Sequence, residues 1–366
     1  MRVGIVSPYS LSLPGGVQGQ VLGLARALRA AGHDARVLGP CDGPPPDVGV
    51  TPLGGSVPTS ANGSVAPIAP DVSTQLRTIS ALRDEAFDVV HLHEPLCPGP
   101  TQTALLFKTA PLVGTFHAAG TELPYRWFGP VVRRAARRLD VRCAVSEEAR
   151  QTALGALGGE YEVVPNAVDV GAFAEATPWP TDGCPTVVFV GRHEQRKGLA
   201  VLLEAFGLLS GEVRLWVIGE GPETERLRAR HPDPRVEWLG RVGDAELASR
   251  LAGADLFCAP SLGGESFGIV LLEAMAAGTA VVASDIGGYA KVARNGRDAL
   301  LAPPGDAAAF AAAIGGLLAD GPRREQLVAA GSDRVSDFSM DAMAATYIGL
   351  YRRAVATQAA PGSRPR

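Results

Sequence analysis

The sequence lacks the features that mark several large classes of protein. Among its 366 residues there is no apolar run of about 18 residues, so no transmembrane helix is expected. A net charge of −4 excludes a global basic field that would recruit nucleic acid. The five cysteines are single, odd in number and free of CxxC spacing, which predicts neither a disulfide framework nor a zinc site. We therefore expect reduced thiols in a cytoplasmic protein.

Further absences concern the N-terminus and the internal organisation of the chain. The first six residues, MRVGIV, have the pattern of a strand and lack a signal-peptide cleavage pattern, so we expect no secretory leader. No short-period repeat is present. The apolar content of 46% and charged content of 20% are typical of a soluble globular protein. The tail at 359–366, AAPGSRPR, is predicted to be disordered.

Strand patterns and helical patterns alternate along the chain. The sequence predicts strands at 2–7, 34–38, 87–93, 112–116, 142–145, 186–190, 213–218, 236–239, 256–259 and 280–283. Such alternation predicts parallel sheets with helices on their faces. The Pro-rich, weakly apolar stretch 177–185 places a domain boundary near 168–182, and 41–70 is expected to be an extended loop. We therefore expect two doubly wound α/β halves that bind ligands at the carboxyl ends of their strands.

The most informative stretch is GGESFGIVLLEAMAAG at 263–278. Glu265 lies in a glycine-rich loop that can approach a ligand closely. The loop opens a helix, and Glu273 is expected two turns into it. Because a helix N-terminus attracts phosphate, one segment can bind a sugar, a diphosphate and a ribose. A hydrolase carboxylate pair is a poorer interpretation, since Glu273 sits beside an apolar Met/Ala surface.

Two other loops follow predicted strands. Arg192, Arg196 and Lys197 lie between a strand and a helix, where cations suit a diphosphate leaving group. The alternative is a solvated charge run, but the apolar strand and flanking glycines favour a function. The PGG sequence that ends at Gly16 is either a phosphate contact or an ordinary flexible turn, and it is not a GxGxxG dinucleotide motif.

Three histidines lie at predicted strand ends. His117 follows a strand and could be a base, a hydrogen-bond donor to a sugar hydroxyl, or a surface residue. His91 and His93 alternate along one strand and share a face. Two ligands without a third nearby are a weak metal signal, so no metal site is predicted.

The chain resembles the retaining glycosyltransferases of the GT-B, family 4 type. The E-x7-E segment, the strand–GR–x–RKG loop and the GGV loop occur in that family's order, over roughly residues 1–355. Within the family, runs such as MRVGIVSPYS, FDVVHLHEP and CAPSLGGESFGIVLLEAMAAGTAVVASD are similar to the actinobacterial phosphatidylinositol mannosyltransferases.

The resemblance implies a GT-B architecture, with two Rossmann-like domains facing a cleft. The N-terminal domain, 1–168, would bind the acceptor and the membrane, and a C-terminal helix at about 341–357 would pack back on it. Residues 169–340 would form the domain that binds the nucleotide-sugar donor.

The resemblance also implies roles for individual residues. Gly16 would face the donor diphosphate, and Arg192, Arg196 and Lys197 would stabilise its phosphates. Glu265 would hold the mannose hydroxyls, and Glu273 would bind ribose, with His117 beside the reacting centre. Backbone N–H groups would come from Ser266, Phe267, Gly268 and Ile269, and the base would be bordered by Val242, Gly243 and Asp244. The acceptor inositol pocket would be lined by Tyr9, Gln18 and Asn62.

The implied reaction transfers mannose from GDP-mannose to the inositol of phosphatidylinositol on the inner face of the cell membrane. Retention without a protein nucleophile fits front-face attack, in which the leaving phosphate takes the acceptor proton. Cations and a helix terminus stabilise the developing charge, so no cofactor is required and Mg²⁺ would at most stimulate.

The acceptor side departs from the family pattern. Glu122 and Pro67 replace cations that would meet the inositol phosphate. The family's membrane helix is strongly basic, whereas 74–83 offers only Arg77 and Arg83. A second basic patch, which could recruit anionic lipid or be an ordinary solvated face, consists of Arg126, Arg133, Arg134, Arg137 and Arg138.

Two alternative functions stay open at this point. One is a family 4 glycosyltransferase with another nucleotide sugar, or with another acceptor such as a diacylglycerol or a sugar phosphate. The other is a non-catalytic protein that binds a nucleotide sugar, and the intact Glu265, Lys197 and His117 argue against it.

Overall fold

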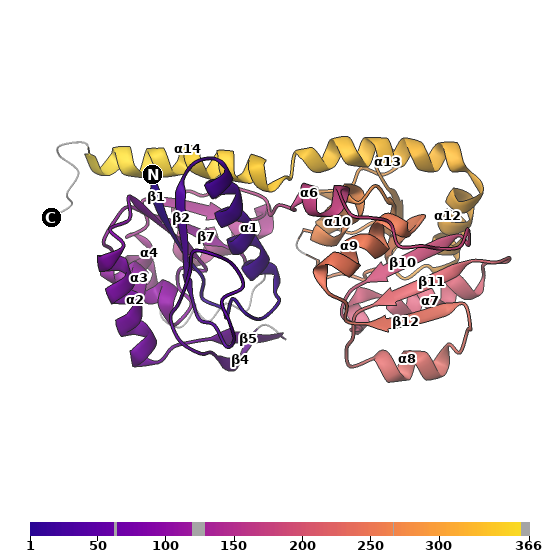
Figure 1. Cartoon of the computed structure of the whole chain (residues 1–366), viewed down its shortest axis with the longest axis horizontal. Helices are drawn as coiled ribbons and strands as arrows, with labels where there is room; N and C mark the ends of the chain where they lie inside the picture. Colours follow the sequence, from indigo (N-terminus) through magenta and orange to yellow (C-terminus); the bar gives the residue numbers. More distant parts are fainter. Residues whose placement is uncertain (62–63, 119–128, 266, 360–366) are drawn as a thin grey trace. The chain divides into compact units, whose positions relative to one another are not determined.

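The structure is a computed structural model that describes residues 1–61, 64–118, 129–265 and 267–359 (Figure 1). The chain forms two compact units. Unit 1 comprises Met1–Ala167 together with the chain from Met340, and unit 2 comprises Val168–Ser339. None of the helices in the described ranges is long and apolar enough to cross a membrane.

Unit 1 is built on a seven-stranded parallel sheet in the order β3-β2-β1-β6-β7-β8-β9. The strands are β1 (Arg2–Val6), β2 (Asp34–Gly39), β3 (Val50–Pro52), β6 (Val89–His93), β7 (Leu112–Phe116), β8 (Val141–Ala144) and β9 (Glu162–Val163). The strand order reverses between β1 and β6, which is where doubly wound sheets bind ligands. Strands β6 and β7 are buried along their whole length, as expected for central parallel strands.

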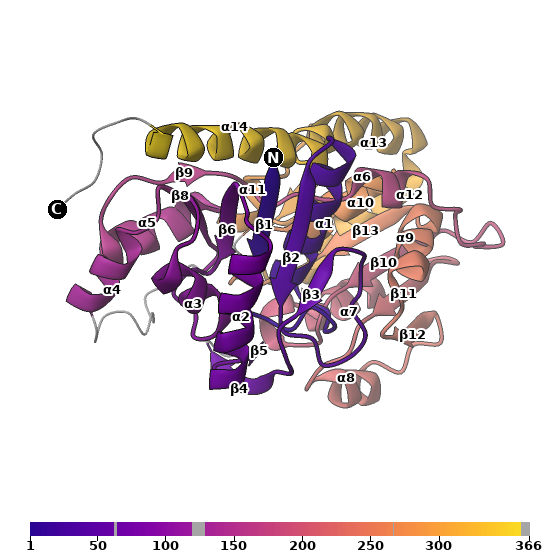
Figure 2. The same ribbon diagram turned by 60° about the vertical axis from the view of Figure 1, so that its left-hand side comes forward.

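Helices cover both faces of this sheet. They are α1 (Gly16–Ala30), α2 (Val72–Asp84), α3 (Pro100–Phe107), α4 (Gly129–Ala136), α5 (Glu147–Leu157) and α14 (Met340–Ala359). One apolar cluster joins α1 and α14 to the sheet, and another joins α2, α3 and α5 to it. Figure 2 shows α14 alongside the strands of unit 1, so the end of the chain belongs to the N-terminal core.

The expectation of an extended loop at 41–70 is wrong in part. This stretch contains β3 and an antiparallel hairpin of β4 (Val57–Ala61) and β5 (Ser64–Ile68). Its prolines hid the strands, but Pro58 and Pro67 face each other across the hairpin. A two-stranded ribbon has free edges where a missing N–H is tolerated. The hairpin reaches the loop after β1, because Tyr9 forms a bridge with Ile68.

Unit 2 is built on a six-stranded parallel sheet in the order β12-β11-β10-β13-β14-β15. The strands are β10 (Thr186–Val190), β11 (Arg214–Ile218), β12 (Val236–Gly240), β13 (Leu256–Ala259), β14 (Ala280–Ser284) and β15 (Leu300–Ala302). The order reverses between β10 and β13, so the loops after these two strands start side by side.

The helices of unit 2 also lie on both sheet faces. They are α6 (Val170–Ala174), α7 (Leu199–Gly207), α8 (Thr224–Arg230), α9 (Asp244–Gly253), α10 (Ile269–Ala276), α11 (Gly287–Ala290), α12 (Ala307–Ala319) and α13 (Gly321–Ser336), with a 3-10 turn at Gln195–Lys197. One apolar cluster holds α7 and α12 on the sheet, and the other holds α9 and α10. The predicted doubly wound α/β halves are thereby confirmed.

Candidate functional site

Two loops meet at the point where the strand order of unit 2 reverses. Gly198 ends the loop after β10 with a left-handed φ of 67°, and a Cβ there would collide with the carbonyl oxygen of Pro260, which follows β13. Leu262 donates its N–H to the carbonyl of Arg196 at 2.8 Å. Because glycine alone allows this approach, the cation loop and the Glu265 loop form one surface.

Glu265 lies at the centre of this surface, with a side chain that is 11% exposed. Its Oε1 is 2.7 Å from Lys197 Nζ and 3.2 Å from Arg196 Nη1. The hydroxyl of Ser261 donates to the same oxygen at 3.3 Å. Charge-assisted contacts of this kind hold the carboxylate in one orientation.

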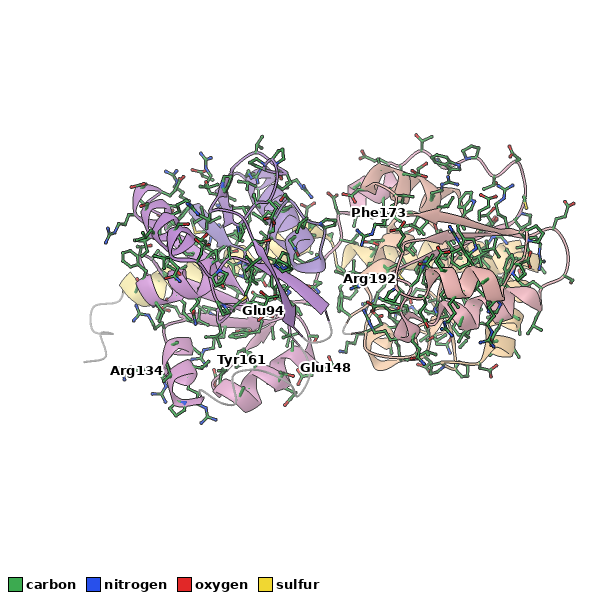
Figure 3. All side chains as sticks on the ribbon, turned by 90° about the horizontal axis from the view of Figure 1, so that it is seen from below. Glu94, Arg134, Glu148, Tyr161, Phe173 and Arg192 are labelled. Atoms are coloured by element: carbon green, nitrogen blue, oxygen red, sulfur yellow. The ribbon has the colours of Figure 1, made fainter. Side chains whose placement is uncertain are left out.

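The cluster carries an excess of positive charge. Arg192 and Arg196 both pair with Glu194, at 3.1 and 2.9 Å, and Arg196 and Lys197 pair with Glu265. Three cations therefore face two carboxylates. The arginine side chains are 54% and 46% exposed, which leaves them accessible to an anion (Arg192 is labelled in Figure 3).

Helix α10 begins next to this cluster. Gly268 precedes it with φ of 93°, and no described side chain caps the helix. Leu271 donates its N–H to the carbonyl of Gly268, which leaves the N–H groups of Ile269 and Val270 for a ligand. The buried side chain of Phe267 packs edge-on against Phe338, with ring centroids 5.5 Å apart. Any ligand contact of Phe267 would therefore come from its backbone. Ser266 lies outside the described residues.

The expected depth of Glu273 in the helix is wrong. Because α10 starts at Ile269, after the left-handed Gly268, Glu273 lies one turn into the helix instead of two. Burial, together with the smaller effect of the charge of Asp244, raises the pKa of Glu273 to about 7. Asp244 is the first residue of α9, with Gly243 as its N-cap, and Val242 packs against the core below. The structure thus brings 242–244 close to Glu273.

A second cluster lies at the carboxyl ends of β6 and β7 in unit 1. His117 Nε2 is 2.9 Å from His93 Nδ1. The buried carboxylate of Glu94 accepts the backbone N–H groups of His117 and Ala118 through Oε1, both at 2.7 Å (Glu94 is labelled in Figure 3). Burial raises the pKa of Glu94, while these two hydrogen bonds lower it. The backbone on either side of His117 is therefore held from β6.

His91 is a core residue of this unit. Its Nδ1 lies 2.8 Å from the hydroxyl of Tyr351, and its Nε2 lies 2.7 Å from that of Thr115. Thr115 also contacts the hydroxyl of Tyr347 on α14 at 2.9 Å. Both ring nitrogens of His91 are thus engaged. In the part of the chain that the structure describes, no group of three His, Cys, Asp or Glu side chains is placed to hold a metal ion.

The remaining predicted residues of unit 1 lie near the loop after β1. Gly16 opens α1 with free space where a side chain would project. Gln18 donates its Nε2 to the carbonyl of Ser10 at 3.3 Å. Burial raises the pKa of Tyr9, and the charge of Glu94 adds to this increase. Because Glu94 also bonds the backbone of His117, Tyr9 lies near the His117 cluster. Asn62 lies outside the described residues.

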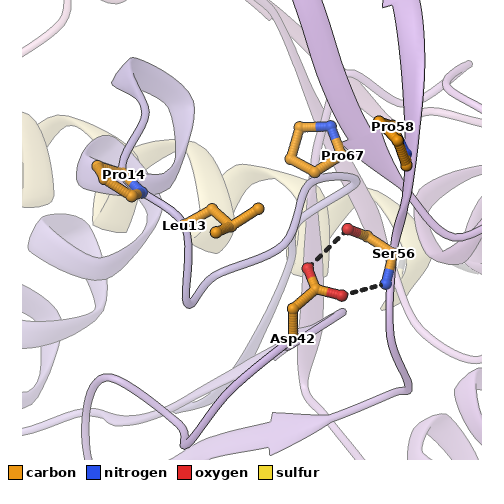
Figure 4. Close-up of a pocket in the computed structure, with 6 residues that line it drawn as sticks. All are labelled: Leu13, Pro14, Asp42, Ser56, Pro58 and Pro67. Carbon is orange, nitrogen blue, oxygen red and sulfur yellow. Dashed lines mark hydrogen bonds between the residues drawn. The ribbon is translucent and has the colours of Figure 1, made fainter.

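A hollow of about 390 Å³ lies between the loop after β1 and the hairpin (Figure 4). Leu13 and Pro14 form one wall, and Pro58 and Pro67 lie on the hairpin side. The polar floor is Asp42, which accepts the N–H and the hydroxyl of Ser56 at 2.7 and 2.6 Å. The hollow is therefore mainly apolar, and none of the described residues that line it is a cation.

The sequence prediction missed residues that serve these clusters. Glu94 comes directly after the buried strand β6 and Ser261 comes two residues after the buried strand β13, and Tyr289 on α11 contacts the Ser261 hydroxyl at 2.8 Å. Position at the carboxyl end of a strand was a usable signal for the first two. Tyr289 offered none, because it joins the site only through folding.

Comparisons with known proteins place the chain in a family. The model "Glycosyltransferase Family 4" matches residues 14–172, and "Glycosyl transferases group 1" matches 184–320. The phosphatidyl-myo-inositol mannosyltransferase of Mycolicibacterium smegmatis is 41% identical over 362 residues, covering 96% of this chain and 93% of that protein. The protein of that name from Mycobacterium leprae is 40% identical, over 100% of this chain and 99% of its own.

Solved structures agree on the fold. Anabaena HepE, solved with UDP and glucose, has a TM-score of 0.72 at 20% identity, with 96% of this chain and 99% of that chain covered. Sucrose-phosphate synthase from Thermosynechococcus elongatus has a TM-score of 0.74 at 22% identity, with 97% and 99% covered. The predicted GT-B fold is confirmed, and the chain belongs to the retaining glycosyltransferases of family 4.

Proposed function

We propose that this enzyme transfers mannose from GDP-mannose to the inositol ring of phosphatidylinositol. The observation that carries the proposal is the identity of about 40% with phosphatidyl-myo-inositol mannosyltransferases over nearly the whole chain. The cluster of Arg192, Arg196, Lys197 and Glu265 supports it, because its excess positive charge suits a nucleotide diphosphate.

In the proposed reaction, the inositol oxygen bonds to the anomeric carbon of mannose as the bond from that carbon to the diphosphate breaks. The acceptor proton goes to the leaving phosphate oxygen. Arg196 and Lys197, together with the free N–H groups at the start of α10, would stabilise the charge that develops on the phosphate. Glu265 would bind mannose hydroxyls, and Glu273 the ribose. Because these cations already supply the charge, we propose that transfer requires no metal ion.

One observation favours a second candidate, a family 4 transferase with another acceptor. Pro67 lines the hollow beside the loop after β1, where the resemblance implies a cation, and the hollow is mainly apolar. Glu122, the other departure, lies outside the described residues. A diacylglycerol would suit an apolar surface better than the inositol phosphate does.

Transfer of labelled mannose from GDP-mannose to phosphatidylinositol in anionic vesicles tests the proposal. UDP-sugars as donors and diacylglycerol as acceptor serve as parallel arms, each with and without EDTA. We expect product from GDP-mannose and phosphatidylinositol, undiminished by EDTA. Product in the diacylglycerol arm alone would establish the second candidate, and product from UDP-sugars alone would refute the donor. Loss with EDTA would refute the metal-independent mechanism.

We further propose that unit 1 binds the membrane surface through an arginine face on and just after α4. This face consists of Arg133, Arg134, Arg137 and Arg138, all exposed, beside Val131, which is 71% exposed. Arg134 lies at the edge of unit 1 in Figure 3. Arg133 and Arg138 donate to the carbonyls of Ala156 and Leu105, as Arg77 of α2 does to the carbonyl of Leu53. Among the described residues, the side chains of Arg134 and Arg137 make no hydrogen bond or ion pair, so these two cations are the most available to a lipid headgroup. Residue 126 lies outside the described part of the chain.

The double variant Arg134→Ala/Arg137→Ala is expected to bind anionic vesicles about thirtyfold more weakly. Two cations near an anionic surface contribute roughly 2 kcal/mol, which corresponds to that factor. Vesicle co-sedimentation measures it. The matched control is Arg226→Ala/Arg228→Ala, which removes two exposed arginines from unit 2 and should bind as wild type. Equal binding of both double variants would refute the role of the arginine face.

A further inference from the structure

Three histidines lie ring to ring in unit 1, of which His91 and His93 are buried and His117 is half-buried. The ring centroids of His91 and His93 are 4.4 Å apart, and those of His93 and His117 are 5.1 Å apart. His91 uses both ring nitrogens on hydroxyl groups, as described above. His93 uses only Nδ1, which contacts His117 Nε2, and its own Nε2 is buried without a partner among the described residues. Only one of the two facing nitrogens can carry the shared proton.

The two arrangements of that proton differ in what they bury. If His117 donates from Nε2, then a neutral His93 carries its proton on Nε2, and a buried N–H is left without an acceptor. If His93 donates from Nδ1, its buried Nε2 is an unpaired acceptor instead. Among backbone groups, orphaned buried N–H groups are rarer than under-satisfied acceptors, and we apply the same preference to the imidazole ring. The surroundings of His93 therefore favour donation from His93 to His117.

We propose that His93 is a positioning residue, which donates Nδ1–H to His117 Nε2 and so holds His117 in its Nδ1–H tautomer. In this tautomer His117 is a hydrogen-bond donor to an oxygen of the reacting sugar and not a general base. The inference rests on the proposed function and on the place beside the reacting centre that the family resemblance implies for His117. It selects one of the three roles that the sequence left open for His117.

Two observations support the proposal. Within the described residues His117 Nδ1 makes no hydrogen bond, while Glu94 holds the backbone N–H groups of His117 and Ala118, so the ring has one free nitrogen on a fixed backbone. Burial lowers the pKa of His117 to about 4 and the pKa of His93 well below its ordinary value. Both rings are then neutral near pH 7, and a neutral ring has a defined tautomer.

The tautomer can be read directly from imidazole ¹⁵N shifts of the full-length protein, with His117→Ala to assign the signal. We expect neutral His117 with the proton on Nδ1. A neutral His117 with its proton on Nε2 would overturn the proposal. This readout needs no substrate, so it stands apart from the identity of the donor and acceptor.

Kinetics of two variants complete the test. His93→Leu removes the partner, and we expect a mixed His117 tautomer and a kcat lowered by roughly tenfold to a hundredfold at unchanged donor KM. His93→Asn places a side-chain amide near the position of the His93 Nδ1 atom. This variant should recover most of the His117 tautomer preference and most of kcat. His33→Asn, elsewhere in unit 1, is the matched control and should resemble wild type. Wild-type kcat and tautomer in a folded His93→Leu enzyme would refute the role. If the leucine variant does not fold, the tautomer of His117 in the wild-type protein decides the proposal.

Discussion

Replacing Glu265 with alanine is expected to lower kcat for mannosyl transfer by about a thousandfold, while the fold and nucleotide binding persist. Glu265 is held by Lys197 at 2.7 Å and by Arg196 at 3.2 Å, so its carboxylate is oriented before any donor binds. Loss of a pre-oriented group that acts on the transferred sugar typically costs 10² to 10³ in rate. The measurement is single-turnover transfer at saturating donor.

The affinity for GDP separates this role from a structural one. Removing the carboxylate frees Lys197 and leaves Arg196 paired only with Glu194, so GDP should bind Glu265→Ala as tightly as wild type or more tightly. Glu175→Ala removes an exposed carboxylate from unit 2 and serves as the control for folding and activity. Turnover at the wild-type rate in Glu265→Ala would refute the role assigned to this residue.

Replacing Lys197 with methionine is expected to lower kcat/KM by about two to three orders of magnitude and to weaken GDP binding about tenfold. The ammonium group is a point charge beside the position proposed for the leaving diphosphate, and methionine keeps a stem of similar shape without the charge. The effect on GDP affinity is thus opposite in direction to that of Glu265→Ala. Transfer kinetics and calorimetric titration with GDP measure the two effects.

A control for Lys197→Met comes from the opposite end of the same sheet. Arg214 starts β11 and pairs with Glu237 at 3.0 Å, at the amino ends of the strands. Arg214→Met removes a cation from the unit without touching the ligand end, so transfer should continue at the wild-type rate. If Lys197→Met binds GDP and turns over like Arg214→Met, then the leaving diphosphate does not lie at the cation loop.

Local sequence patterns predicted most of the strands and helices, because these elements depend mainly on residues that are close together in the sequence. The strands at 112–116, 186–190 and 256–259 are found with the predicted bounds, since their apolar runs are buried on both faces. The hairpin at Val57–Ala61 and Ser64–Ile68 was missed because proline and glycine dominate the local signal. The start of α10 was misplaced because Gly268 is left-handed, and Glu273 moved by a turn with it.

By itself the sequence determined the family, the two doubly wound units and the loops that carry Arg192, Arg196, Lys197 and Glu265. These depend on residue type, on hydrophobic period and on position after a strand. Only the tertiary structure decided that Lys197 and Arg196 share one carboxylate oxygen with Ser261, and that His93 faces His117 while Glu94 holds its backbone. The physical reason is that most of these contacts join residues at the ends of, or in the loops after, different strands, and strand pairing brings those loops together whatever their separation along the chain.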